Sequence, residues 1–161
     1  IVVIQAFVMY TFFPLITVLL LKGLKFIDSI FLHTQRDRII PFTACMIWYF
    51  WAWYVRHNLP GTPHELVYFS LAVFIVSILG MLANIYMKVS MHAMAMGVAT
   101  TFLMLMSFSQ DISFTVYVSL ALIITGIVCT SRLIVSDHTA GEIYVGLFIG
   151  VISQIAAYYI A

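Results

Sequence analysis

The stretch LVYFSLAVFIVSILGMLANIYM, residues 66–87, lies between Glu65 and Lys88 and contains no charged side chain. A helix rises about 1.5 Å per residue, so a stretch of this length matches a hydrocarbon core of about 30 Å. The stretch lacks the apolar and polar alternation of membrane β-strands, and lipid requires backbone groups to be hydrogen-bonded internally. It therefore predicts a helix that crosses a membrane.

Five more stretches of this kind appear when charged residues are taken as boundaries. The six predicted spans are residues 1–21, 39–55, 66–87, 89–110, 112–131 and 143–161. An even number of spans places both termini on one side of the membrane. We expect an all-α integral membrane protein in which a six-helix transmembrane bundle forms one domain over residues 1–161.

The composition supports this expectation. Of the 161 residues, 64% are hydrophobic and 8% are charged, and the mean hydropathy is +1.12. A soluble domain carries about 25% charged residues, so a soluble enzyme, a disordered tail and a disulfide-stapled secreted module are excluded. The net charge of +1 gives no reason to expect a nucleic-acid partner. Cys45 and Cys129 lie in apolar runs, which favours two packed thiols over a disulfide bridge.

Two shorter features complete the predicted architecture. In residues 22–33, apolar and polar positions alternate at helical spacing, which indicates a short helix lying in the membrane interface after the first span. The apolar positions are Leu24, Ile27 and Phe31, and the polar ones are Lys22, Lys25, Ser29 and His33. Gly146 and Gly150 form a GxxxG pattern in the last span, which permits close helix approach. Packing inside the bundle is favoured over dimerisation.

With six spans, six of the seven basic residues fall on one face of the membrane. They are Lys22, Lys25, Arg36, Arg38, Lys88 and Arg132, accompanied by His33, His92 and His138. The opposite face holds Arg56, beside a tryptophan- and tyrosine-rich end of the second span that is typical of headgroup depth. The positive-inside rule explains such a cluster by topology alone, whereas the cost of ionisable groups near a membrane favours a functional site.

The segment SRLIVSDHTAGE, residues 131–142, favours the functional interpretation. His138 and Glu142 are four residues apart, so we expect them to share a helix face. The carboxylate can then accept a proton from one imidazole nitrogen and leave the other free to attack. We expect Arg132 to meet His138 across a short turn between antiparallel helices. Asp137 or Ser136 is the expected cap of the last helix, whose free N–H groups favour an anion.

Two further segments contribute to the same face. KVSMHA, residues 88–93, offers the Lys88 cation, the Ser90 hydroxyl and the His92 imidazole. RDRIIP, residues 36–41, offers Arg36 and Arg38. Taken singly, such residues are more often structural caps or membrane anchors. Their coincidence with His138 predicts a phosphate site.

These residues resemble the motifs of the type 2 phosphatidic acid phosphatase family, written K-x6-R-P, P-S-G-H and S-R-x5-H-x3-D. Ser131, Arg132 and His138 match the third motif, with Glu142 in place of the aspartate. Ser90 and His92 match the second motif, without its proline and glycine. Arg38 is the candidate arginine of the first motif. The family lysine is absent at the expected position, and Lys22, Lys25, Arg36 and Lys88 are open alternatives.

The resemblance implies a metal-independent lipid phosphate or isoprenyl diphosphate phosphatase that uses no cofactor. It implies that His138 attacks phosphorus to form a phosphohistidine, that Glu142 orients His138, and that His92 protonates the leaving group. The implied phosphate ligands are Arg132, Ser131, Arg38, Ser90, Lys88 and Arg36. It also implies a site on the extracytoplasmic side of a bacterial cytoplasmic membrane, with the bilayer and a lipid phosphate as partners.

Two alternative functions remain open at this stage. A catalytically inactive or transporter-like protein would use the same residues only to bind a phospholipid or phosphate. A redox protein would use His92 and His138 as haem ligands, but the spacing of Arg132, His138 and Glu142 would then have no explanation.

Overall fold

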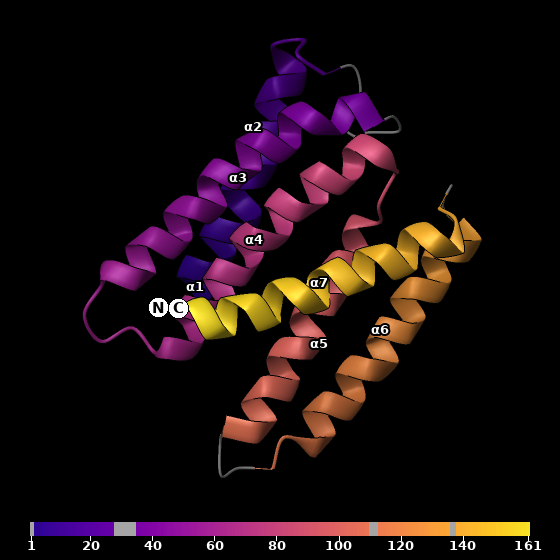
Figure 1. Cartoon of the computed structure of the whole chain (residues 1–161). Helices are drawn as coiled ribbons and strands as arrows, with labels where there is room; N and C mark the ends of the chain where they lie inside the picture. The colour runs from indigo at the N-terminus through magenta and orange to yellow at the C-terminus, as the bar shows by residue number, and fades with distance from the viewer. Residues whose placement is uncertain (1, 28–34, 110–112, 136–137) are drawn as a thin grey trace.

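A computed structural model describes residues 2–27, 35–109, 113–135 and 138–161 of the chain, with side chains except at 2–3 and 35–38 (Figure 1). This described part is helical and contains no β-strand. The helices are α1 (Val2–Phe7), α2 (Phe13–Gly23), α3 (Gln35–Asn58), α4 (His64–Tyr86), α5 (Met91–Ser109), α6 (Thr115–Val135) and α7 (Ala140–Ile160), and a π-helical segment, Val8–Phe12, joins α1 to α2.

Five helical stretches are long and apolar enough to cross a membrane, and each overlaps a predicted span. They are Ile4–Gly23, His64–Tyr86, Met91–Ser109, Thr115–Val135 and Ala140–Ile160. The remaining predicted span, residues 39–55, lies within the continuous helix α3, but α3 does not reach the same apolarity. Its second half is rich in tryptophan and tyrosine, and Arg56 lies in its last turn. Helical membrane architecture is therefore supported, and the count of six spans is not confirmed.

The core of the bundle is formed by α4, α5 and α7. Helix α7 packs against both α4 and α5, and α6 packs mainly on α5. About a third of the residues of α4, α5 and α7 are buried, whereas almost none of the residues of Ile4–Gly23 or α6 are fully buried. These two peripheral helices therefore present most of their apolar surface outward, as helices surrounded by lipid do.

The closest helix contact in the core is between α5 and α7. A Cβ added to Gly150 would meet the carbonyl oxygen of Met94, and one added to Gly97 would meet the carbonyl oxygen of Leu147. A Cβ on Gly146 would lie 2.8 Å from the carbonyl oxygen of Ser90. The GxxxG pattern thus serves internal packing, as predicted. Cys45 and Cys129 are both free, half-buried thiols, in agreement with the prediction that they form no disulfide bridge with each other.

The two ends of the bundle differ in what they hold. At one end, which we call the Arg56 end, Gln5 lies beside the turn between α3 and α4, and the His64 ring nitrogen Nε2 lies 3.3 Å from the carbonyl oxygen of Ala161. At the other end, the His138 end, the α4–α5 connection meets the start of α7. Both ends of the described chain therefore lie at the Arg56 end (Figure 1).

The predicted interfacial helix after the first span is not confirmed. Over its described part the chain leaves α2 in a helix-ending turn, in which Phe26 N–H bonds to the Leu21 carbonyl and Lys25 N–H to the Lys22 carbonyl. This is the Schellman pattern, with Lys25 at the left-handed position usually held by glycine (φ 60°). The rest of the predicted helix, residues 28–33, lies outside the described residues.

Candidate active site

His138 and Glu142 contact each other at the start of α7, as their spacing predicts. His138 Nδ1 lies 3.3 Å from Glu142 Oε2, and the two side chains are 8% and 16% exposed. The contact is not made along a helix face, because α7 begins only at Ala140 and His138 precedes it. The extended backbone of Thr139 brings the ring back over the first turn. This contact engages Nδ1 and leaves Nε2 as the second ring nitrogen of His138.

The cap of α7 is Thr139, so the prediction of Asp137 or Ser136 is wrong; both lie outside the described residues. Thr139 Oγ1 accepts from the Glu142 N–H at 3.3 Å, and Glu142 Oε2 accepts from the Thr139 N–H at 2.9 Å. This reciprocal arrangement is a capping box. The sequence Thr-Ala-Gly-Glu at 139–142 carries its signature and could have revealed it. One oxygen of Glu142 therefore serves both the cap and His138.

The segments that resemble the second and third motifs lie against each other. The Ser90 N–H donates to the Glu142 carbonyl oxygen at 3.3 Å, and the absence of a side chain on Gly146 lets α7 approach the Ser90 carbonyl. Ser90 is fully buried, and its Oγ accepts from the Ala93 N–H at 3.4 Å, which caps α5. That bond uses the Ser90 oxygen as an acceptor and does not engage the hydroxyl hydrogen.

The other candidate residues around Ser90 are less enclosed. His92 lies in the first turn of α5 and is exposed, and Lys88 is half-buried in the connection that precedes it. Both residues make further contacts within the structure. The structure thus places His92, Lys88 and Ser90 within one short segment that contacts the start of α7.

Ser131 and Arg132 occupy the last turns of α6, and both are half-buried. The Ser131 hydroxyl donates to the Val128 carbonyl at 2.8 Å, so its hydrogen is engaged within its own helix. Ser131 would have to break this bond to donate to a phosphate. Arg132 carries the remaining donor capacity of this segment, and its predicted contact with His138 is not among the contacts that the structure describes.

Arg36 and Arg38 lie in the first turns of α3, and their side chains lie outside the described residues. Lys22, in the last turn of α2, and Lys25, in the following turn, are both exposed. Their sequence positions put all four residues around the connection between α2 and α3. The structure does not choose among them as the missing lysine of the first motif.

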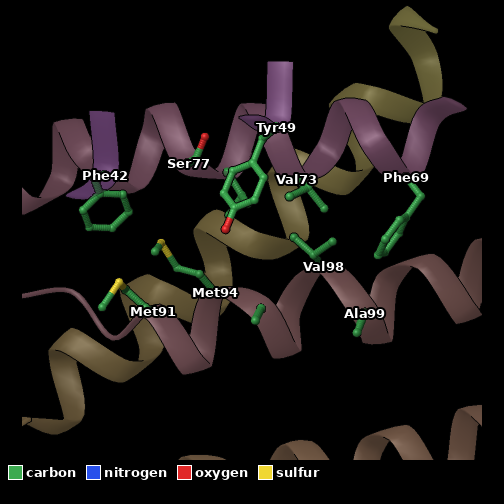
Figure 2. Close-up of a pocket in the computed structure, with 11 residues that line it drawn as sticks. Phe42, Tyr49, Phe69, Val73, Ser77, Met91, Met94, Val98 and Ala99 are labelled. Atoms are coloured by element: carbon green, nitrogen blue, oxygen red, sulfur yellow. The ribbon is translucent and has the colours of Figure 1, made fainter. Parts of the chain in front are cut away.

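An apolar cavity of about 240 Å³ lies between α3, α4 and α5. Met91, directly beside His92 in sequence, lines it at the beginning of α5, and Val98 lines it two turns deeper. Figure 2 shows Tyr49 reaching from α3 towards Met94 and Val98 of α5. The cavity therefore extends from the segment holding Ser90 and His92 into the apolar part of the bundle.

The sequence interpretation missed a second polar cluster, at the Arg56 end. Arg56 Nη1 donates to the Tyr10 hydroxyl oxygen at 2.6 Å and to Ser70 Oγ at 3.0 Å. No local signal could have revealed it, because its members come from three helices. Among the described residues, no group of three or more histidine, cysteine, aspartate or glutamate side chains is placed to hold a metal ion. The chain matches no protein-family model, no curated protein and no solved structure.

Proposed function

We propose that this protein is a membrane-embedded, metal-independent phosphatase that acts on a lipid phosphate or diphosphate through a phosphohistidine on His138. The observation that carries the proposal is the contact of Ser90 with Glu142, the residue that also contacts His138. Two segments far apart in sequence, each resembling a motif of one phosphatase family, are thereby brought to one place.

The chemistry follows from the roles of the two imidazoles. His138 Nε2 forms a bond to phosphorus while the bond from phosphorus to the leaving oxygen breaks, and His92 donates a proton to that oxygen. Water then attacks the phosphohistidine while His92 accepts a proton from that water, the bond from phosphorus to Nε2 breaks, and phosphate is released with His138 and His92 restored. Glu142, held near Nδ1, stabilises the positive charge that the ring gains in the first step.

Phosphoryl transfer depends mainly on positioning and on stabilising the charge of the non-bridging oxygens. In this proposal Arg132 supplies a cation from the last turn of α6 and Lys88 supplies one from the connection before α5, and Arg36 and Arg38 supply them from the start of α3. Ser90 retains a hydroxyl hydrogen for a phosphate oxygen, whereas Ser131 must first release the Val128 carbonyl.

The cavity supports an amphiphilic substrate. A lipid phosphate whose head lies near His138 needs an apolar environment for its chain, and the walls of the cavity from Met91 to Val98 offer one beside the motif segment. We propose that α3 also crosses the membrane, which brings the number of spans to six, and that a short interfacial helix follows α2. We further propose that the site faces the extracytoplasmic side of a bacterial cytoplasmic membrane.

A second candidate function is binding of a lipid phosphate without hydrolysis. It is favoured because two side chains of the proposed site, those of Glu142 and Ser131, already form hydrogen bonds that stabilise helices. Glu142 is a member of a capping box, and the Ser131 hydroxyl is bonded to its own helix. A chain that retained these groups for structure alone would keep the same contacts.

The decisive experiment measures inorganic phosphate released from a panel of lipid phosphates in mixed micelles, with EDTA present. We expect wild-type release that survives chelation and is blocked by vanadate, and we expect His138→Ala to abolish it. Binding of a lipid phosphate with no release by the wild type would favour the second candidate. Full release by His138→Ala would contradict the assignment of the nucleophile.

His92→Ala is the companion variant. General acid catalysis contributes about 10²- to 10⁴-fold, so we expect a loss of that order for alkyl phosphates. The loss should be smaller for aryl phosphates, whose leaving groups need less protonation. An equal loss on both substrates would contradict the role of His92 as the acid.

A further inference from the structure

The polar cluster at the Arg56 end is built by three helices. Tyr10 comes from the π-helical segment, Arg56 from the last turn of α3, and Ser70 from the second turn of α4. The Tyr10 hydroxyl donates to Ser70 Oγ at 2.8 Å, and Ser70 donates to the Leu66 carbonyl at 2.6 Å. π-helical segments occur frequently at functional sites, and this one places Tyr10 against the guanidinium of Arg56.

Arg56 keeps unused donors in this arrangement. Its guanidinium has five N–H groups, and the bonds to Tyr10 and Ser70 use the two on Nη1. Within the described residues, no hydrogen bond is formed by Nη2 or Nε, and no carboxylate forms an ion pair with Arg56. The face of Tyr10, 5.1 Å from the guanidinium carbon, offers only a weak substitute for a counter-ion.

Arg56 also lines a small cavity of about 130 Å³. Its walls are Arg56, Gln5 and Leu66 together with the turn between α3 and α4, residues 59–63. Gln5 is exposed, and its side-chain amide forms no hydrogen bond among the described residues. The cavity is therefore lined by one uncompensated cation and one free amide, a pair of donors suited to an anion with several oxygens.

The level of the cavity relative to the membrane indicates the source of such an anion. Trp51 and Tyr54, both exposed on α3, lie within two turns of Arg56, and rings of this kind mark the headgroup level of a bilayer. Phosphate groups of phospholipids lie at that level, and arginine binds them through paired N–H groups. A cation at membrane depth without a protein counter-ion is expensive unless an anion compensates it.

We propose that this cavity binds the phosphate of an anionic phospholipid headgroup, in the leaflet opposite the His138 end. Arg56 Nη2 and Nε and the Gln5 amide donate to the phosphate oxygens, while Tyr10 and Ser70 hold the guanidinium in place. The bound lipid would also link the peripheral first helix to α3. The proposal does not depend on the phosphatase activity, because the site lies at the other end of the bundle.

The test is lipid retention by the purified full chain, measured by native mass spectrometry with phosphatidylglycerol as the probe. We expect wild type to retain one phosphatidylglycerol that Arg56→Gln loses, with apparent affinity about tenfold weaker or worse. Gln5→Ala should weaken retention by a few-fold. Gln5 bonds to no described residue, so this variant tests the site even if Arg56→Gln fails to fold. Retention equal to wild type in Gln5→Ala, or in a folded Arg56→Gln, would overturn the proposal.

Two further probes distinguish the source of the anion, with the shift in thermal unfolding midpoint as the readout. Inorganic phosphate supplies the anion without chains, and a neutral galactosyl diacylglycerol supplies chains without the anion. We expect phosphatidylglycerol alone to raise the midpoint of wild type, and Arg56→Gln to lose that shift. An equal shift with inorganic phosphate would replace the lipid by a free anion, and an equal shift with the galactolipid would remove phosphate recognition altogether.

Discussion

Glu142 is both a member of the capping box of α7 and the carboxylate beside His138, and substitutions can separate these two roles. Glu142→Gln keeps an amide oxygen for the Thr139 N–H but removes the negative charge beside His138 Nδ1. We expect phosphate release to fall about 10- to 100-fold, the cost typical of losing an orienting partner. The unfolding midpoint should change little. Both quantities are measured on the same detergent-purified sample.

Thr139→Ala is the matched control for this variant. It removes the oxygen that accepts from the Glu142 N–H and leaves the carboxylate beside His138 in place. Loss of a helix cap costs about 1 kcal/mol, so we expect a lower unfolding midpoint and nearly unchanged release per folded molecule. If Thr139→Ala reduced release as strongly as Glu142→Gln, the placement of His138 by the cap would matter rather than the charge.

How far the sequence predicts this site depends on whether the contact is local. The four-residue spacing predicted that His138 and Glu142 meet, although the contact is made through a capping box and not along a helix face. The bond from Ser90 to the Glu142 carbonyl depends on how α5 crosses α7, and no spacing in one chain encodes a crossing. The Tyr10, Arg56 and Ser70 cluster was missed for the same reason.

The crossing of helices α5 and α7 depends on glycines at the contact. A Cβ on Gly150 would meet the backbone of Met94, which cannot yield as a flexible side chain can. We expect Gly150→Ala to lower the unfolding midpoint by several degrees and to weaken the contact between Ser90 and Glu142. Phosphate release should fall with it. Tryptophan fluorescence, recorded while the protein is heated in detergent, measures the change in the unfolding midpoint.

Gly126→Ala in α6 is the matched control, because nothing lies within 4 Å of a Cβ placed there. Alanine favours a helix over glycine by about 1 kcal/mol, so this variant should be as stable as wild type or more stable. A similar loss of stability in both variants would mean that glycine matters for lipid contact or flexibility rather than for the approach of α5 to α7.

The helices themselves were predictable to a greater degree than their contacts. Every predicted span overlaps a helix, because a charge-free stretch must satisfy its backbone groups internally in lipid. Residues 24–27 were predicted to be helical from periodicity, yet Lys25 adopts a left-handed conformation that ends α2. A lysine gives no warning of such a turn, since glycine is its usual occupant.

The number of spans decides on which side of the membrane each connection between helices lies. The structure puts Gln5 and Ala161 at the Arg56 end and the α4–α5 connection at the His138 end. If α3 spans the membrane, the connections that precede and follow it lie on opposite sides. If α3 does not span, these two connections share a side.

Single cysteines test this directly, in a chain whose native Cys45 and Cys129 are replaced by serine. Lys22→Cys reports the connection before α3, Asn58→Cys the one after it, and Ser113→Cys the α5–α6 connection; all three positions are exposed. We expect a membrane-impermeant maleimide to label Lys22→Cys in intact spheroplasts. Asn58→Cys and Ser113→Cys should be labelled only after lysis, because six spans place both connections on the side opposite Lys22. Labelling of Lys22→Cys and Asn58→Cys from the same side would reduce the spans to five, and labelling of Lys22→Cys only after lysis would reverse the proposed orientation of the His138 end.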